Sequence, residues 1–347
     1  MGRTHRVLRA RAPLRLSFAG GGTDVSPFPE REGGAVLSAT ISSFAYSTLR
    51  PRDDGLITVK SLDYGLSVDF GVDDPLELDG QLDLPKAAIA RVRAHADAQP
   101  SSGFDLFLHT SAPPGSGLGS SSAVIVSVVG LVAAHCGLSM SRHEIAQLAC
   151  LLEREDLGIA GGRQDQYAAA FGGFNYMEFQ ADQVVVNPLR IPDETVHELE
   201  HNMLLAYTGR TRASDHIIDD QVFRYTTGVQ DASEGLRTQR ALAEEMKNVL
   251  LRGEVDTFGA LLGEAWKAKR KMSDRISTPL IDDAIELAGK AGAYGGKVTG
   301  AGGGGHIIFC CEFERRHLVA EALIGLGLQV SEFTFSRDGV TTWWGRG

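Results

Sequence analysis

Residues 113–123 constrain the fold of this chain more than any other segment. They read Pro-Pro-Gly-Ser-Gly-Leu-Gly-Ser-Ser-Ser-Ala and lie between an alternating apolar segment at 103–110 and an apolar run that extends to about Cys136. This order predicts a strand, a glycine-rich loop and a helix in direct succession. Glycines let backbone N–H groups approach an anion, and the helix N-terminus adds partial positive charge. The segment therefore predicts a phosphate-binding loop made of Pro113, Pro114, Gly115, Ser116, Gly117, Leu118, Gly119, Ser120, Ser121 and Ser122.

The loop differs from two familiar phosphate-binding loops. No Gly-Lys-Ser/Thr sequence follows its glycines, which excludes a Walker A motif, and the glycines at 115, 117 and 119 lack the spacing of a dinucleotide fingerprint. The simpler alternative is an ordinary turn between a strand and a helix. However, three consecutive serines exceed what helix capping requires. One of their hydroxyls is a candidate ligand for Mg²⁺.

Composition limits the class of protein and of partner. The 347 residues are 43% hydrophobic and 22% charged, which is typical of a globular protein with two packed domains. The net charge of −10 disfavours nucleic acid and anionic membranes as partners, so an anionic substrate needs a local basic pocket. The apolar run 123–134 is too short to span a bilayer, and no signal peptide precedes the first strand. We expect a cytoplasmic protein.

Elsewhere the pattern alternates between strands and helices, which predicts an α+β fold. Residues 35–49 alternate as a strand, and 142–155 form one helical segment. Residues 295–305 contain most of a second glycine cluster and are expected to be a loop before a strand at 306–311. A helix at about 316–326 and a final strand should close the chain.

Three motifs in this order resemble those of the GHMP kinases, a family that includes galactokinase and mevalonate kinase. They are Ala12–Asp24, Pro113–Ala123 and Lys297–Gly305. The resemblance covers nearly the whole chain. It implies an ATP-binding N-terminal domain at 1–195, a C-terminal domain at 196–347 and an active-site cleft between them. It also implies that the chain uses ATP as co-substrate and Mg²⁺ as cofactor.

The resemblance further implies the residues that carry out phosphoryl transfer. Asp165 corresponds to the carboxylate that faces the acceptor hydroxyl, either as general base or as electrostatic anchor; a helix cap is the structural alternative. Arg15 would keep Asp165 ionised and stabilise charge on the transferred phosphate, unless it is merely a surface arginine. The expected magnesium ligands are Ser121, with Ser120 second, and Glu153, with Glu155 as a rival.

The acceptor is expected to be a sugar phosphate. Galactokinases have Glu-His before Thr-Asp where this chain has Gly21-Gly22, and two glycines there would open space for a different or larger sugar. The first motif and residues 160–167 are most similar to the heptose 7-phosphate kinases of the family, which phosphorylate the anomeric hydroxyl on the way to nucleotide-activated heptose. Basic residues near 210 and 269 are candidates for binding the acceptor phosphate, unless they are solvated surface charges. The expected substrate-binding residues are Gly21, Gly22, Thr23, Asp24, Gly162, Gln164, Arg210, Lys269, Arg270, Gly302, Gly303 and Gly304.

Two other functions remain open at this point. One is another sugar-1-kinase, similar to a fucokinase, whose acceptor carries no phosphate. The other is a catalytically silent relative that binds ATP and sugar as a regulator. Retention of Arg15, Ser121, Glu153 and Asp165 disfavours the silent relative. The chain could act as a monomer or as a homodimer.

Overall fold

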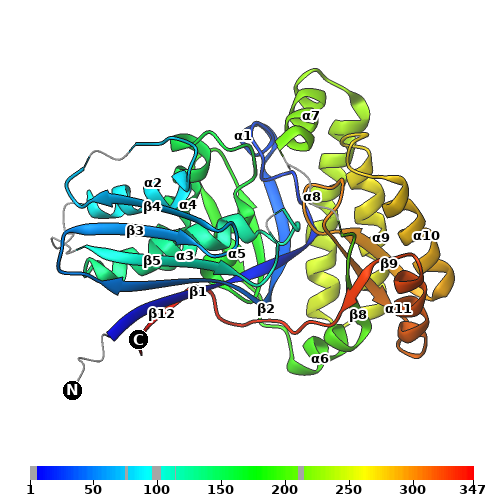
Figure 1. Ribbon diagram of the computed structural model, residues 1–347. Coiled ribbons are helices and arrows are strands. Elements are labelled where there is room, and N and C mark those ends of the chain that lie inside the picture. Colours follow the sequence, from blue (N-terminus) through cyan, green and yellow to red (C-terminus); the bar gives the residue numbers. More distant parts are fainter. Residues whose placement is uncertain (1–5, 75–76, 96–102, 114, 210–214) are drawn as a thin grey trace.

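The computed structural model describes residues 6–74, 77–95, 103–113, 115–209 and 215–347. Eight strands within these ranges form a first sheet, in which the order β12-β1-β2-β5-β3-β4 is extended by β6 and β7 beside β2 (Figure 1). Only β3 and β5 pair in parallel. The strands are β1 (Arg6–Ala19), β2 (Gly34–Pro51), β3 (Leu56–Ser61), β4 (Leu66–Gly71), β5 (Phe104–Thr110), β6 (Phe174–Phe179), β7 (Val184–Pro188) and β12 (Thr341–Arg346).

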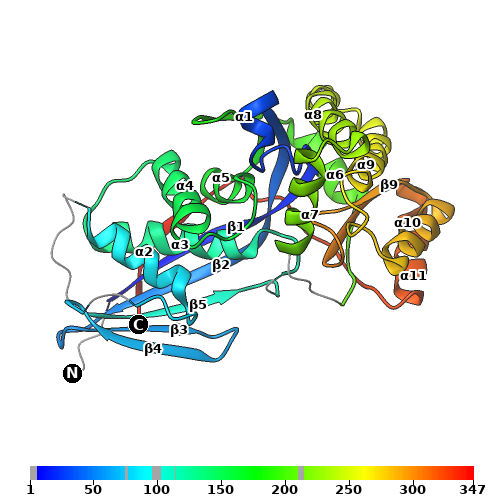
Figure 2. The same cartoon turned by 90° about the horizontal axis from the view of Figure 1, so that it is seen from above.

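Helices cover one face of this sheet, as the view from above shows (Figure 2). They are α2 (Asp83–Arg93), α3 (Ser120–His135), α4 (Arg142–Leu151) and α5 (Gln164–Phe171). Helix α3 is apolar on all sides and almost wholly buried, because it packs against β1 and β2 below and against the other helices around it. The apolar run after the glycine-rich loop is thus the central helix of this half.

A second sheet lies beside the first body (Figure 1). It has the antiparallel order β11-β8-β10-β9, and its strand β10 is buried along its whole length. The strands are β8 (Met203–Tyr207), β9 (Ala293–Val298), β10 (His306–Cys311) and β11 (Gln329–Ser331), and the helices around them are α8 (Gln230–Leu251), α9 (Val255–Arg270), α10 (Pro279–Ala291) and α11 (Arg316–Gly325). Three further helices are α1 (Phe28–Glu32), α6 (Asp193–Asn202) and α7 (Asp215–Thr226). Within the described ranges, no helix combines the length and the apolarity needed to cross a membrane.

Most expected elements are present, with two corrections. The single helix expected at 142–155 is divided: α4 ends at Leu151, and a π-helical turn continues from Leu152 to Asp156. The loop expected at 295–305 is wrong for its first four residues, which belong to β9. Gly295 allows β9 to lie directly against α9, because a Cβ atom there would stand 2.4 Å from the carbonyl oxygen of Gly259.

The expected final strand is present, and it belongs to the first sheet. After β11 the chain crosses back, and β12 pairs antiparallel with β1, so both described ends lie at one edge of the first sheet (Figure 1). The expected domain boundary between residues 195 and 196 stays a prediction. The segment after it supplies one strand, β12, to the sheet of the N-terminal segment. The order of residues along the chain could not indicate this pairing, because β12 and β1 lie at its opposite ends.

Candidate active site

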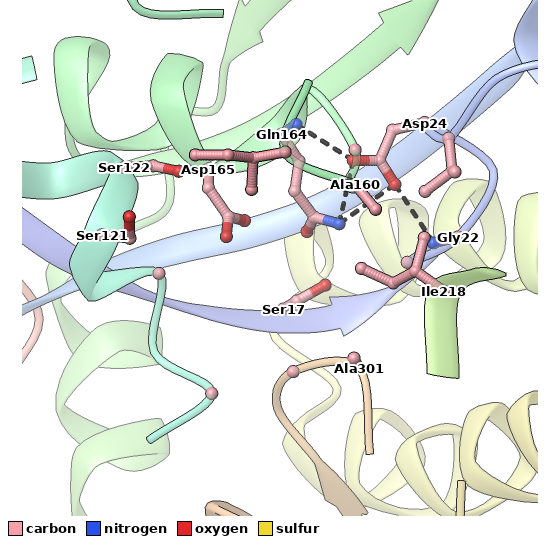
Figure 3. A pocket seen from close by; sticks show the side chains of 18 of the residues that line it. Ser17, Gly22, Asp24, Ser121, Ser122, Ala160, Gln164, Asp165, Ile218 and Ala301 are labelled. Carbon is pink, nitrogen blue, oxygen red and sulfur yellow. Dashed lines mark hydrogen bonds between the residues drawn. The ribbon is translucent and has the colours of Figure 1, made fainter. Parts of the chain in front are cut away.

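A cavity of about 270 Å³ lies between the two bodies. Its walls are the C-terminal part of β1 and the loop after it, the glycine-rich loop before α3, the segment leading into α5, and residues of α7 and α9 (Figure 3). Residues 299–301, which follow β9, complete the wall. The three sequence motifs therefore meet at one cavity.

Arg15 connects these motifs through its guanidinium group. Its Nε and Nη2 donate to the two carboxylate oxygens of Asp165 at 2.7 and 2.8 Å. Its Nη1 donates to the carbonyl oxygens of Gly117 at 2.6 Å and Thr299 at 3.3 Å. A bidentate contact between arginine and carboxylate fixes the orientation of both groups. The structure thus places Asp165 at a defined position beside the head of α3.

Gly119 makes this close approach possible. It is the residue before α3, and its φ of 73° is a left-handed conformation that favours glycine. A Cβ atom at this position would stand 3.2 Å from the Oδ2 atom of Asp165. The backbone of the loop can therefore run directly beside the carboxylate, with the first turn of α3 open to the cavity.

Glu153 lies on the π-helical turn and is buried, with 2% of its surface exposed. Its carboxylate accepts hydrogen bonds from the hydroxyls of Ser122 at 2.8 Å and Ser121 at 3.3 Å, and from the Gln166 amide. The nearest cation is Arg154, whose Nη2 is 3.7 Å away. Burial raises the pKa of Glu153. Additional positive charge beside this carboxylate would offset the cost of its burial.

The group around Glu153 fits a magnesium ion. It offers carboxylate and hydroxyl oxygens, which are the hard ligands that Mg²⁺ prefers, and Ser121 is exposed towards the cavity. The described residues contain no cluster of three or more histidine, cysteine or acidic side chains suited to a metal. An ion here would therefore take most of its ligands from phosphate and water. Glu155 is exposed, so the geometry favours Glu153 over its rival.

Asp24 lies opposite, at the end of the loop after β1. Its buried carboxylate accepts hydrogen bonds from the backbone N–H of Gln164 at 3.0 Å and of Gly22 at 3.1 Å. The Gln164 side chain donates to both oxygens as well, at 3.1 and 3.2 Å (Figure 3). Because Gln164 is the first residue of α5, Asp24 caps the helix that carries Asp165. The two carboxylates are thus positioned by one short helix.

Comparison with known proteins shows the family of this chain. The family model described as GHMP kinases N terminal domain matches residues 83–173, and the one described as GHMP kinases C terminal matches residues 242–326. A D-glycero-alpha-D-manno-heptose 7-phosphate kinase of Campylobacter jejuni is 38% identical over 339 residues, which are 97% of this chain and 99% of that protein. The chain belongs to the GHMP kinase family.

Two further relatives of this GHMP kinase are informative. The crystal structure of a D-glycero-D-manno-heptose 1-phosphate kinase from Bacteroides thetaiotaomicron is similar with a TM-score of 0.81 at 37% identity, covering 97% of this chain and 98% of that one. An L-fucokinase/L-fucose-1-P guanylyltransferase of Bacteroides fragilis is 28% identical over 326 residues, which are 87% of this chain and 34% of that longer protein.

In this GHMP kinase, most of the expected site residues line the cavity. From the glycine-rich loop these are Gly115, Gly117, Gly119, Ser120, Ser121 and Ser122. Three other loop residues, Pro113, Ser116 and Leu118, do not line it, and Pro114 lies outside the described residues. From the acceptor side the lining residues are Gly21, Gly22, Asp24, Gly162, Gln164 and Lys269.

Several expected substrate-binding residues have other surroundings. The Thr23 hydroxyl is bonded to the carbonyl oxygens of the backbone around it, and Arg270 is half exposed beside Asp282. In the C-terminal motif, residues 299–301 line the cavity in place of Gly302, Gly303 and Gly304. The reason is that the N–H of Gly303 is turned away to the Ile276 carbonyl oxygen, at 2.8 Å. Arg210 lies outside the described residues.

The expectation that two glycines open space for the sugar needs correction at Gly22. This residue has a φ of 103°, and a Cβ atom there would stand 2.4 Å from Met272 Cε and 2.7 Å from Gln221 Nε2. Backbone conformation and packing therefore require glycine at 22, although the residue lines the cavity. Gly21 is different, because a Cβ atom there would make only ordinary contacts.

Some cavity residues were not expected from the sequence. Ser17 and Thr299 lie inside the motifs but carry no distinctive spacing, and Arg154 directly follows Glu153. Ile218 and Gln221 belong to α7, a helix that was not expected. The signal available in the sequence was the helical spacing of the apolar residues Ile217, Ile218, Val222 and Tyr225.

Proposed function

We propose that this GHMP kinase transfers the γ-phosphoryl group of ATP to the anomeric hydroxyl of a heptose 7-phosphate, giving the 1,7-bisphosphate used for nucleotide-activated heptose. The observation that carries the kinase proposal is the Arg15–Asp165 pair beside the head of α3. The heptose acceptor is supported by the names of the two relatives with more than 35% identity over nearly the whole chain.

One set of groups in the cavity is suited to binding the phosphates of ATP and Mg²⁺. The backbone N–H groups at the start of α3 and the open turns at Gly115 and Gly117 bind the phosphates. Ser121 and Glu153 would hold Mg²⁺, which supplies positive charge to the phosphate oxygens. Arg154 borders the same wall. The site thus concentrates positive charge where the phosphates are expected.

Asp165 acts on the acceptor. Its carboxylate orients the anomeric hydroxyl, whose oxygen forms the new bond to the γ-phosphorus while the bond to the ADP oxygen breaks. The hydroxyl proton leaves towards the carboxylate during or after transfer, since a loose transition state requires little base assistance. Arg15 holds Asp165 in position and adds positive charge beside the transferred group. Asp24 fixes α5, and with it Asp165.

An assay of ADP release tests the function. With Mg·ATP, the protein should turn over heptose 7-phosphate and be at least about a hundredfold less active on the free heptose, because loss of a bound charged group costs several kcal/mol. Preference for an unphosphorylated sugar such as fucose would support the fucokinase-like alternative. No ADP with any aldose or aldose phosphate would support the silent regulator instead.

We also propose a cytoplasmic location. The four cysteines are buried and form no disulfide bond with one another, which suits a reducing compartment. The small sugar phosphate is the proposed partner, and a monomer or a homodimer is compatible with the site, whose lining comes from one chain.

A further inference from the structure

Beside Gly21 the cavity contains three polar groups without partners. The Ser17 hydroxyl and the Gln164 amide oxygen are buried and form no hydrogen bond with any residue in the described ranges. The Lys269 side chain is 4% exposed, and its ammonium group forms no hydrogen bond or salt bridge with another described residue. A methyl group on Gly21 would stand 3.4 Å from Ser17 Oγ, 3.6 Å from Gln164 Nε2 and 3.8 Å from Lys269 Nζ. We call Ser17, Gly21, Gln164 and Lys269 the Gly21 niche.

Such a cluster is unusual for a purely structural feature. Buried polar groups are nearly always hydrogen-bonded, because an unpaired one keeps its full desolvation cost. Lys297 shows how this protein accommodates a structural lysine: it is buried nearby on β9, and its Nζ donates to the carbonyl oxygens of Ser17 at 2.8 Å and Val298 at 3.2 Å. Burial lowers the pKa of Lys269 to about 8, since no bonded partner offsets it. The niche therefore has the composition of a binding site.

The chemistry of the niche selects hydroxyl groups. The Gln164 Nε2 atom donates to both oxygens of Asp24, so the orientation of the amide is set and its Oε1 atom can only accept. Figure 3 shows the Ser17 side chain directed towards this amide. A phosphate oxygen would accept from Lys269 but would repel Gln164 Oε1. A sugar hydroxyl can accept from Lys269 and donate to Gln164 Oε1, and Ser17 can do either.

We propose that the Gly21 niche binds hydroxyl groups of the acceptor sugar next to the hydroxyl that reacts, with Lys269 and Ser17 as donors and Gln164 as acceptor. The reacting hydroxyl lies nearby, because Gln164, Lys269 and Asp165 line the same cavity and the Lys269 ammonium group is close enough to Asp165 for their charges to interact. This inference rests on the proposed function. It makes Lys269 a specificity-determining residue for hydroxyls, so the phosphate of the acceptor binds elsewhere.

Gly21→Ala tests the niche with little risk to folding. Gly21 does not have a left-handed φ, and the new methyl makes only ordinary contacts, so the melting temperature should stay close to that of the wild type. The methyl occupies the niche, so the KM for the acceptor should rise about tenfold or more while the KM for ATP stays within about twofold. Gly289→Ala on α10 is the matched control, because its methyl meets nothing within 4 Å.

Lys269→Met separates hydroxyl binding from phosphate binding. We expect kcat/KM for the acceptor to fall about thirtyfold or more. An acceptor lacking the hydroxyl next to the anomeric carbon should already be poor for the wild type, and Lys269→Met should reduce it little further. Inhibition by inorganic phosphate competing with the acceptor should be unchanged. If Lys269→Met weakens that inhibition, or loses as much activity on the deoxy acceptor, the hydroxyl assignment is wrong.

The activity of the wild type shows whether a negative result contradicts the niche or the proposed function. Turnover of heptose 7-phosphate by the wild type, together with unchanged acceptor KM in Gly21→Ala and Lys269→Met, overturns the niche and leaves the function intact. If the wild type prefers another aldose, the proposed acceptor is wrong and the same variants are compared on that sugar. If it turns over no sugar, both proposals fail.

Discussion

Asp165 receives two hydrogen bonds from Arg15, one on each carboxylate oxygen, and this arrangement limits what the residue can do. A carboxylate held by an arginine is a fixed acceptor with restricted rotation. Such a group is well suited to orienting a hydroxyl. The same hydrogen bonds stabilise the charged form of the carboxylate. This favours the role of electrostatic anchor over that of a base that takes up the proton fully.

We predict that Asp165→Asn reduces turnover about a thousandfold. The amide has nearly the same shape as the carboxylate but lacks its charge, so the acceptor hydroxyl loses its ionised partner. Affinity for Mg·ATP should stay within about threefold, because the loop and α3 bind the phosphates. Single-turnover kinetics and calorimetry with Mg·ATP measure the two effects. Unchanged turnover would remove Asp165 from the chemistry.

Lys269 should reduce the stability of the free protein. Its pKa is about 8 in the folded state and near 10.5 in the unfolded chain, so the unfolded chain binds its proton more tightly. The cost is present in full below pH 8 and disappears as the pH rises towards 10.5. It amounts to about 3 kcal/mol. Asp24, Asp165, Arg15 and Lys297 are the charged groups around it that contribute to this balance.

We therefore predict that Lys269→Met stabilises the free protein at pH 7. Met is of similar length and carries no charge, so the desolvation cost is removed. Denaturant unfolding of both proteins at pH 7 and at pH 10 checks this, since the advantage of the variant should shrink at the higher pH. A less stable variant at pH 7 would show that Lys269 has a structural partner.

Among the elements, the π-helical turn after α4 has the clearest consequence. If α4 continued as a regular α-helix, the side chains after Leu151 would point in other directions around the helix axis. With the π-helical turn, Glu153 is buried and Glu155 is exposed. The first turn of α3 presents Ser121 and Ser122 to the same point. Two neighbouring elements thus build the proposed magnesium site.

We predict that Glu153→Gln raises the Mg²⁺ concentration for half-maximal activity about tenfold or more. The substitution keeps the hydrogen-bonding shape but removes the ionised ligand. In the absence of Mg²⁺, the free energy of unfolding of the variant should not be lower than that of the wild type at neutral pH. Burial raises the pKa of Glu153 above its value in the unfolded chain. Ionisation of this carboxyl therefore destabilises the folded protein as the pH rises from the unfolded to the folded pKa.

Glu155→Gln is the control for the magnesium prediction, because Glu155 is exposed and only two residues away. Magnesium titrations of ADP release, with thermal unfolding in chelator, compare the three proteins. An equal shift in both variants would indicate a general effect of lowered negative charge rather than a ligand at Glu153.

For the whole molecule, the important contacts are those between the two bodies at the cavity. The Thr299 hydroxyl donates to the Gly117 carbonyl oxygen at 3.0 Å, and the N–H of His306 donates to the Ser116 carbonyl oxygen at the same distance. Lys297 reaches Ser17 on β1. The C-terminal motif and the start of β10 therefore hold the glycine-rich loop in place through hydrogen bonds. The site requires both bodies.

The return of the chain to the first sheet leads to a prediction at this scale. Removing residues 341–347 deletes β12 and leaves the edge of β1 unpaired over Arg6–Arg11. Because β1 also carries Arg15, we expect the melting temperature to fall by about 5 °C or more and turnover to fall with it. Thermal unfolding and the ADP assay measure both. Unchanged values would show that β12 is dispensable.

The sequence by itself determined most of the elements and the chemistry of the motifs. The alternation at 35–49 and 103–110, and the apolar run after the serines, were sufficient because side-chain periodicity reports the local backbone directly. Arg15, Glu153 and Asp165 were expected from the resemblance to the GHMP kinases, and their residue types suit phosphoryl transfer. All three lie at one cavity.

Only the tertiary structure decided the rest. The pairing of β12 with β1, the inward position of Glu153 on a π-helical turn and the difference between Gly21 and Gly22 all depend on what packs against these residues from distant parts of the chain. The Gly21 niche is the clearest case, since β1, α5 and α9 each supply one of its unpaired groups. Local periodicity carries no information about such contacts, because they arise only when separate elements pack together.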